Sequence, residues 1–203
     1  MTALPAESCP DDLCELPGAP RAGADAAPAE PGADLALETG SPEEILALFE
    51  ARGWGDGLPL VPPTDERVAE MLRAGAGSPP ADPDEVIATL PPRFGRATRR
   101  AIAVNAVLAG CRPGLLPVVV TAVRALADPA VNLRGVNATT HCVAPLVIVH
   151  GAAVREQGFN AGAGTFGPGC RANASVGRAV RLVLLHVAGA RPGDGDASTQ
   201  GGP

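Results

Sequence analysis

The sequence predicts a helix-rich α/β fold with a small buried sheet, and an irregular α+β fold is the alternative. Two patterns support this class. Apolar side chains recur at helical spacing across residues 172–187, and residues 143–149 form an uninterrupted, largely β-branched apolar run that is typical of a buried strand. Hydrophobic residues make up 46% of the chain and aromatic residues only 2%, so the core must be aliphatic.

Order is expected to begin near residue 40. Residues 1–39 are rich in Ala, Pro, Gly and acidic residues, and such a mixture buries too little apolar surface to offset its ordering entropy. This segment is therefore predicted to be a flexible acidic tail. Residues 40–190 are predicted to form a single globular domain, and residues 191–203 a flexible C-terminal tail.

Several helices are predicted from capping signals. In Ser41-Pro42-Glu43-Glu44, a serine precedes a proline at the first helical position and a glutamate three residues after the cap, which is the pattern of a capping box. This helix should run through Phe49. Equivalent signals predict helices at residues 64–72, 82–88, 98–109 and 113–127.

The longest predicted helix covers residues 172–187 and ends before Gly189. Its apolar positions form one stripe, whereas Arg171, Arg178 and Arg181 lie largely off that stripe.

Strands are predicted from apolar runs. Residues 143–149 should be buried on both faces, with Pro145 near an edge or a bulge. Shorter strands are expected near residues 58–61 and 131–136.

Composition excludes several classes of function. The net charge is −6, all 16 basic residues are Arg and aromatic residues are scarce, so nucleic-acid binding is not expected. Without Lys, the chain has neither a Schiff-base amine nor a Walker lysine. No secretory signal is apparent, and the apolar runs are shorter than the roughly 20 residues that cross a bilayer. A cytoplasmic location with reduced thiols and no membrane insertion is therefore expected.

A glycine-rich segment at residues 162–169 precedes the longest predicted helix. It matches the GxGxxG pattern, but no strand leads directly into it and the following segment lacks the acidic residue of a dinucleotide site. Backbone amides around Gly162 and Gly164, together with Arg171, instead predict a subsite for a carboxylate or phosphate. A purely structural turn is the alternative.

Residues 53–64, with the sequence GWGDGLPLVPPT, contain the single tryptophan and one carboxylate among residues that force an unusual backbone path. Trp54 is expected either to form a wall of the substrate site or to anchor packing. Asp56 is a candidate acid or base, and the alternative is a carboxylate that accepts hydrogen bonds from turn amides.

The densest polar cluster lies where the predicted strand begins. Polar side chains at strand ends are frequent ligand positions in α/β proteins. Substrate binding by Asn137, Thr139 and Thr140 and an acid–base role for His141 are therefore predicted. Cys142 should point away from His141 on a strand, and it is expected to pack as a small apolar residue.

Cys111 lies in the predicted turn between two helices, beside the amino end of the second, where the helix dipole favours a thiolate. It is the candidate nucleophile or redox thiol. Asn105, Asn160 and Asn173 are the polar groups expected to orient the substrate, and His186 is expected to be a satisfied core histidine. No set of His, Cys, Asp or Glu residues has zinc-site spacing, so no metal is predicted, and the cofactor is unknown.

Four segments carry a family resemblance. They read GWGDGLPLVPPT at 53–64, AVNAVLAGC at 103–111, ATT at 138–140 and GPGCRANASVGRA at 167–179. Together they resemble a bacterial family found with UGSC-type proteins, a group that includes thiol- and selenol-containing oxidoreductases.

The resemblance covers residues 42–199 and implies thiol chemistry, with Cys111 as the cysteine that fits the family pattern. Cys142 and Cys170 stand where other residues are expected. Members of the family continue beyond the position of residue 199, which leaves open a split enzyme, a shortened subunit or an inactive relative. The Gly-Cys-Gly-Ser-Cys signature of UGSC-type proteins is absent, so redox chemistry would be shared with a partner protein.

Three functions follow as hypotheses. The first is an enzyme subunit that acts on a small anionic metabolite by thiol-dependent redox chemistry shared with a second protein subunit. The second is a lyase or hydrolase in which Asp56 and His141 transfer protons and the cysteines only pack. The third is a noncatalytic accessory subunit whose acidic tail, with Cys9 and Cys14, binds a partner.

Overall fold

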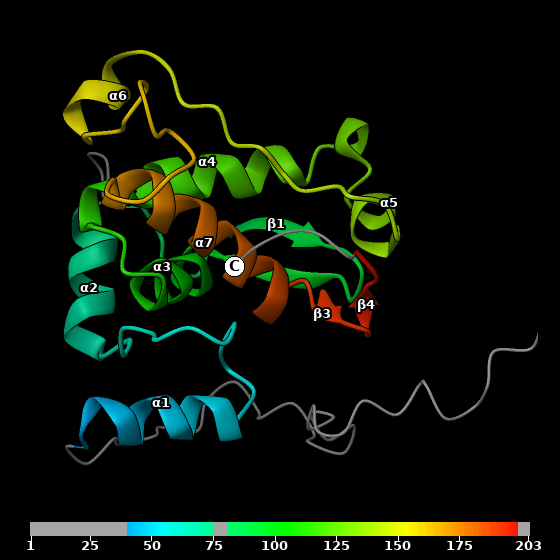
Figure 1. The fold of residues 1–203 in the computed structure, drawn as a ribbon, viewed down its shortest axis with the longest axis horizontal. Coiled ribbons are helices and arrows are strands. Elements are labelled where there is room, and N and C mark those ends of the chain that lie inside the picture. The colour runs from blue at the N-terminus through cyan, green and yellow to red at the C-terminus, as the bar shows by residue number, and fades with distance from the viewer. Residues whose placement is uncertain (1–39, 75–80, 199–203) are drawn as a thin grey trace, which may run out of the picture. The chain divides into compact units, whose positions relative to one another are not determined.

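The structure is a computed structural model that describes residues 40–74 and 81–198 (Figure 1). It is helix-rich, with a two-stranded antiparallel sheet and a short parallel pair of strands, which confirms the predicted class. Residues from Ser41 onward belong to one unit. The tail predicted at residues 1–39 lies outside the described residues.

The elements follow one another in a simple order. They are α1 (Pro42–Ala51), α2 (Asp65–Ala74), β1 (Val86–Leu90), β2 (Gly95–Thr98), α3 (Arg99–Leu108), the 3₁₀ turn η2 (Pro113–Leu115), α4 (Leu116–Leu126), the 3₁₀ turn η3 (Pro129–Val131), α5 (Leu133–Ala138), α6 (Ala152–Glu156), α7 (Arg171–His186), β3 (Arg191–Pro192) and β4 (Gly195–Asp196).

Two predicted capping signals are confirmed in atomic detail. At α1, the Ser41 hydroxyl accepts a hydrogen bond from the Glu44 amide at 3.2 Å, and the Glu44 carboxylate accepts one from the Ser41 amide at 2.7 Å. At α3, the Thr98 hydroxyl accepts a hydrogen bond from the Ala101 amide at 3.1 Å. These bonds satisfy backbone donors that a helix leaves free at its start.

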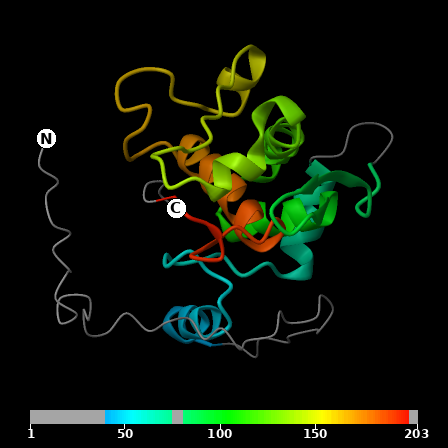
Figure 2. The same ribbon diagram turned by 90° about the vertical axis from the view of Figure 1, so that its right-hand side faces the viewer.

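Helix α7 lies at the centre of the core. It packs against α3 and α4, and Figures 1 and 2 show it running beside both helices. The predicted apolar stripe is buried at Val176, Val180, Val183 and Leu184. Leu182 and Leu185, which lie off the predicted stripe, are buried as well, so α7 is covered on more than one side.

The helix predicted at residues 82–88 is wrong. Asp82 accepts a hydrogen bond from the Asp84 amide at 2.9 Å, but this cap closes only a turn, and the chain then continues as β1. β1 pairs with β2 in antiparallel register, which buries Leu90 and Ala97 completely. Pairing with a neighbouring strand and burial of these side chains therefore outweigh a helix start that had only one turn to stabilise.

The strands predicted from apolar runs are also wrong. Residues 143–149 are extended without being part of a sheet, and Leu146 and Ile148 are 64% and 76% exposed. Residues 58–61 form irregular backbone, and residues 131–136 lie mainly in α5. A strand needs a hydrogen-bonding neighbour, and none of the described strands lies beside these segments.

The helix predicted to start at Pro113 is divided. A 3₁₀ turn, η2, comes first, and α4 begins at Leu116. Pro117 has no N–H group to donate to the carbonyl of Pro113, so a continuous α-helix cannot include that bond. Cys111 therefore precedes a short turn.

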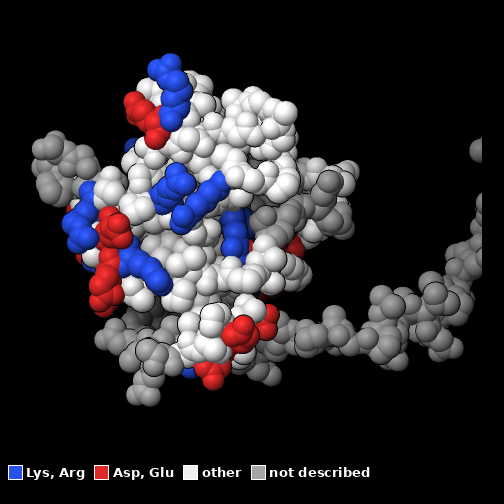
Figure 3. Space-filling model, turned by 60° about the vertical axis from the view of Figure 1, so that its left-hand side comes forward, with Lys and Arg blue, Asp and Glu red and all other residues white. Residues whose placement is uncertain are grey.

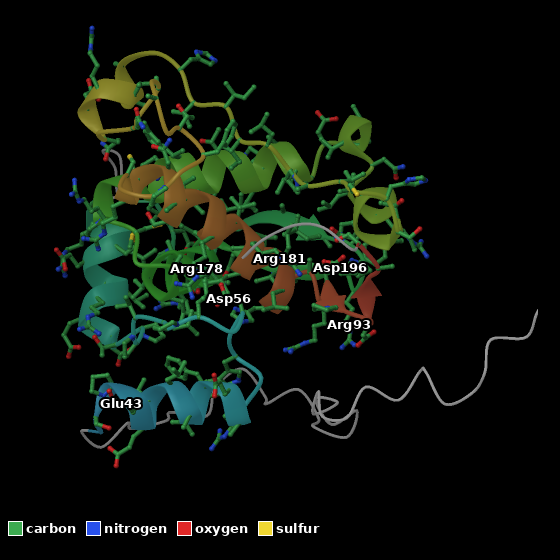
Figure 4. The ribbon with its side chains drawn as sticks, in the orientation of Figure 1. Glu43, Asp56, Arg93, Arg178, Arg181 and Asp196 are labelled. Carbon is green, nitrogen blue, oxygen red and sulfur yellow. The ribbon has the colours of Figure 1, made fainter. Side chains whose placement is uncertain are left out.

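The C-terminal segment predicted to be flexible from Arg191 is held in place as far as residue 198. Arg181 on α7 binds Asp196 at 2.9 Å, and both side chains appear together in Figure 4. The Ala197 amide donates to the Asn137 carbonyl at 3.0 Å. The composition of this segment predicted a flexible tail because it contains no information about partners far away in the sequence, such as Arg181 and Asn137.

None of the described helices is by itself long and apolar enough to cross a membrane. One bent pair, Pro113–Leu126 with Pro129–Ala138, meets the length and composition test only when both are taken together, at an angle of 69°.

Two glycine substitutions test the packing around α7. A Cβ atom on Gly95 would lie 1.8 Å from the Val187 carbonyl oxygen, so Gly95→Ala should lower the free energy of unfolding by about 2 kcal/mol or more. At Gly177, within α7, an added methyl group would meet no atom within 4 Å, so Gly177→Ala should raise stability by about 0.5–1 kcal/mol. Urea unfolding measures both, and equal effects would contradict the packing described.

Candidate functional site

Cys170 occupies the N-cap position of α7, which is the longest described helix. Its side chain is partly exposed. The thiol lies 2.9 Å from Asn173 Oδ1 and 3.3 Å from the Gly158 carbonyl oxygen, and in its protonated form it donates to one of them. We call Cys170, Asn160, Asn173 and the loop at residues 162–169 the α7 N-terminal site.

Asn160 and Asn173, both predicted substrate-binding residues, hold this site together. The Asn160 amide donates to Asn173 Oδ1 at 2.9 Å, and Asn173 Nδ2 donates to the carbonyls of Asn160 and Thr165. Asn160 Oδ1 accepts a hydrogen bond from the Gly162 amide at 2.9 Å. These two side chains therefore fix the path of the glycine loop beside Cys170.

The glycines of the loop leave its backbone open. Gly164 and Gly169 have φ angles of +74° and +106°, which few residues other than glycine adopt. A Cβ atom at either position would meet no described atom within 4 Å. Glycine is therefore needed here for the turn, and the open space beside it lets another molecule approach the backbone.

The environment of Cys170 favours its thiolate. The nearby backbone amide of Asn173 lowers the pKa of the thiol most strongly; burial opposes this effect, while the amides of Asn160 and Ala172 and the positive charge of Arg112 add to it. The net result is a lowered pKa. Backbone amides and positive charge at a helix start are the usual cause of reactive cysteines.

Cys111 behaves in the opposite way. It is only 6% exposed, and its thiol donates to the Ser175 carbonyl at 3.3 Å. Burial raises the pKa of the Cys111 thiol, and the Ser175 contact and the charge of Arg171 only partly offset that effect. Burial therefore opposes the thiolate predicted at Cys111, because the cost of desolvating a charge exceeds what a short turn provides.

Arg171, the predicted anion-binding arginine, lies at the first turn of α7 beside the Cys111 turn. Its Nε donates to the Gly110 carbonyl at 2.8 Å. Part of the guanidinium group therefore ties α7 to the end of α3. The structure does bring Cys111 and Arg171 close together, as expected.

Asp56 is paired with Arg178 of α7 by two hydrogen bonds of 2.7 and 2.8 Å, and Figure 4 shows the two side chains pointing toward one another. Both are largely buried, with side-chain exposures of 6% and 16%. Arg178 also donates to the carbonyls of Leu58 and Pro59. Burial alone would raise the pKa of Asp56, but the bonds and charge of Arg178 outweigh it and leave the pKa lowered.

Trp54 packs against α1, and Asn105 contacts the carboxyl end of α7. The Trp54 ring packs against Phe49, with ring centroids 6.0 Å apart, which supports the packing interpretation. Asn105 Oδ1 lies 2.6 Å from His186 Nδ1, and Asn105 Nδ2 donates to the Ala101 carbonyl. His186 Nε2 is buried and has no hydrogen-bond partner among the described residues, so this histidine is only half satisfied.

The predicted polar cluster at residues 137–142 is not part of the α7 N-terminal site. Asn137 is buried and donates to the Pro91 carbonyl at 3.3 Å. The Thr139 hydroxyl accepts a hydrogen bond from the His141 amide, and Thr140 and His141 are exposed. No hydrogen bond joins these side chains to the α7 N-terminal site within the described ranges. The predicted site residues thus form three groups. The first lies at the start of α7 and includes Cys111 and Arg171, the second includes Asp56, Trp54 and Asn105, and the third consists of residues 137–142.

Two residues that are central to these groups, Cys170 and Arg178, were not predicted as site residues from the sequence. Cys170 is not among the predicted site residues, although its position directly before the Arg171 helix signals an N-cap. Arg178 is predicted only as a residue off the apolar stripe, and nothing in the sequence pairs it with Asp56, which is 122 residues away. In the part of the chain that the structure describes, no group of three or more His, Cys, Asp or Glu could hold a metal ion.

Charges are unevenly arranged on the surface. Figure 3 brings the left-hand side of Figure 1, where α7 begins, toward the viewer. Basic side chains gather in the middle of this face, and acidic side chains lie mainly toward its edges. The face therefore attracts anions more than the net charge of −6 suggests.

Replacement of Asp56 tests whether its ion pair is structural. Asp56→Asn leaves Arg178 buried without a charge partner and should lower the free energy of unfolding by about 3 kcal/mol. The matched control is Asp84→Asn, which breaks an exposed pair with Arg100 and should cost less than about 1 kcal/mol. Urea unfolding measures both. An Asp56→Asn chain as stable as the unaltered one would show that the pair does not hold this loop.

His186 predicts a specific pH dependence. Burial, helped by the charge of Arg191, lowers the pKa of His186 to about 4. The unfolded histidine, with a pKa of about 6.5, takes up a proton first as the pH falls, so stability is lost from about pH 6.5 downward. Between pH 7 and pH 4.5 the loss from this group should be about 2 kcal/mol.

The measurement is urea unfolding of the unaltered chain and of two variants across that pH range. His186→Gln should remove most of the pH-dependent loss, whereas His150→Gln, at an exposed histidine, should leave it unchanged. If His186→Gln kept the full pH dependence, another group would be its source.

Comparisons of the chain with models of protein families, with curated proteins and with solved structures find no match. The resemblance to the family found with UGSC-type proteins therefore stays a prediction. Of the three groups of residues, the α7 N-terminal site has the features that chemistry requires: an accessible thiol, positive charge and open backbone.

Proposed function

We propose that this chain is a cytoplasmic enzyme subunit that carries out thiol-dependent redox chemistry on a small anionic metabolite, with Cys170 as the reactive thiol. The observation that carries the proposal is the position of this partly exposed thiol at the amino end of α7, where its pKa is lowered. A cytoplasmic location fits because thiols there are kept reduced. Cys170 thus replaces Cys111 as the proposed reactive cysteine.

The surroundings favour an anionic substrate. The amino end of a long helix carries partial positive charge, and Arg112 lies near enough to lower the pKa of Cys170. Arg112 is exposed and its guanidinium group makes no hydrogen bond with the described residues, so this group is free to bind a carboxylate. The open backbone at Gly164 and Gly169 gives such a substrate room to approach.

The proposed reaction is thiol–disulfide exchange with a small disulfide that bears carboxylates. The Cys170 thiolate attacks one sulfur, the S–S bond breaks, and the other half leaves as a thiolate that takes a proton. One thiolate of a dithiol on the partner protein then attacks the Cys170 sulfur of the mixed disulfide, and the second half of the metabolite leaves as a thiol. The other thiolate of the partner breaks the new bond to Cys170, which releases Cys170 and leaves the partner as a disulfide. The metabolite is reduced to two thiols, and the partner dithiol supplies both electrons.

The alternative in which Asp56 and His141 transfer protons has less support. Both carboxylate oxygens of Asp56 are bound by Arg178, and its lowered pKa makes it a weak base. His141 is exposed and its hydrogen bonds to described residues reach only Thr139 and Val143. The noncatalytic accessory subunit is the alternative that remains if Cys170 proves unreactive.

The test follows mixed-disulfide formation in the full chain with oxidised glutathione, a disulfide with several carboxylates. Peptide mass spectrometry locates the adduct at each pH. We expect Cys170 to react before Cys142, although Cys142 is more exposed, and to reach its maximal rate at a lower pH. Cys111 should react only when the chain is unfolded, because it is buried.

Matched controls separate charge from exposure. An uncharged disulfide, 2-hydroxyethyl disulfide, should react more slowly with Cys170 than oxidised glutathione does, and Arg112→Gln should reduce this preference. Arg134→Gln, at another exposed arginine, should not reduce it. Equal rates and equal pH profiles for Cys170 and Cys142 would rule out thiol chemistry at the α7 N-terminal site and favour an accessory subunit.

A further inference from the structure

The backbone of the apolar segment at residues 143–149 is almost unpaired within the described part of the chain. Apart from one bond between the Val143 amide and the His141 carbonyl, no backbone hydrogen bond links these residues to any described residue. Figure 1 shows this part of the chain crossing from α5 to α6 as an extended line. Extended backbone with free N–H and C=O groups on its edges is a template for pairing with another strand.

The side chains of residues 146–149 alternate as those of a strand do, whereas residues 143–145 are all exposed. Val147 and Val149 are half-buried, whereas Leu146 and Ile148 are largely exposed. Isoleucine and leucine are costly to leave in water, at about 1.5–3 kcal/mol for a side chain that could be fully buried. The outward face of the segment is therefore apolar and uncovered.

An apolar groove accompanies the segment. Its volume is about 680 Å³, and it lies between the segment and the outer side of α4. A second cavity of about 530 Å³ lies between the start of the segment and α7. The α4 residues that line the first groove are Pro117, Val118, Thr121, Ala122, Ala125 and Leu126.

The segment and the lining of the first groove contain no Asp, Glu, Lys or Arg. From residue 135 to residue 154 the sequence contains no Asp, Glu, Lys or Arg. Exposed edge strands in soluble proteins usually carry charged side chains that prevent pairing, and here Pro145 alone could blunt the edge. An identical segment brings no buried charge with it, whereas a charged strand would lose its hydration in this groove.

We infer that residues 143–149 pair in antiparallel orientation with the same residues of a second copy of the chain. A strand that pairs with itself in this way creates a two-fold symmetric interface in which both copies use the same surface. The pairing satisfies backbone groups along the paired edge and places Leu146 and Ile148 against side chains of the second copy on the same face of the new sheet.

The first experiment measures the molar mass of the full 20.3 kDa chain by analytical ultracentrifugation over a range of concentrations. The unaltered chain should form a dimer. Ile148→Glu places a charge on the paired face and should weaken dimerisation about tenfold or more, whereas Ile148→Val should leave it nearly unchanged. The matched control is Phe94→Asn, which removes a 57% exposed apolar side chain from the β1–β2 turn and should have no effect.

The second experiment distinguishes strand pairing from mere apolar contact. Hydrogen exchange of the amides of residues 146–149 should slow as the concentration rises through the dimer range, and should stay fast in Ile148→Glu. Because Ile148 is exposed, its replacement should leave the circular dichroism of the helices unchanged. A chain that stays monomeric, a dimer that Ile148→Glu does not weaken, or a dimer in which these amides remain fast would each overturn the inference.

Discussion

The burial of α7 is the constraint on which the other features of this structure depend. Nine of its sixteen residues are buried, so the helix cannot move without opening the core. Its two ends differ as a result. The amino end keeps Cys170 partly exposed beside open backbone, whereas near the carboxyl end His186 is enclosed against Asn105. A rigid helix holds both side chains in fixed positions, which favours the reactivity proposed for the thiol. Burial makes the histidine costly to protonate.

The arginines of α7 show how a polar face can serve the fold as well as a ligand. The sequence places Arg171, Arg178 and Arg181 off the apolar stripe and predicts that Arg171 binds an anion. In the structure each binds another segment of the same chain: Arg171 the end of α3, Arg178 the loop at residues 53–64, and Arg181 the segment near Asp196. Each guanidinium group thus holds a turn or loop against α7: the turn at Gly110, the loop at residues 53–64 and the short segment around Asp196.

Local signals in the sequence predicted helices well and strands poorly, for a physical reason. The caps at Ser41 and Thr98 bond to amides only three residues away, so the sequence nearby contains both partners. The pairing of β1 with β2 depends on a neighbouring segment that overrode the cap at Asp82. Residues 143–149 have the composition of a buried strand, but no described strand lies beside them. The composition of a segment indicates how much apolar surface it can bury, but it does not indicate whether a neighbouring strand is available to pair with it.

The two cysteines beside α7 show that the pKa of a thiol near a helix start depends on burial as well as on the helix dipole. The dipole rule points to Cys111 in the sequence, but this residue lies before a turn, whereas Cys170 is the residue that begins a long helix. Both lie near an arginine, yet the pKa of Cys111 is raised and that of Cys170 is lowered. Water remains near Cys170 and is excluded from Cys111, so only Cys170 avoids the full cost of a buried charge. The reactivity proposed for Cys170 therefore depends on an exposed helix start, and the buried Cys111 contributes packing and a hydrogen bond to Ser175.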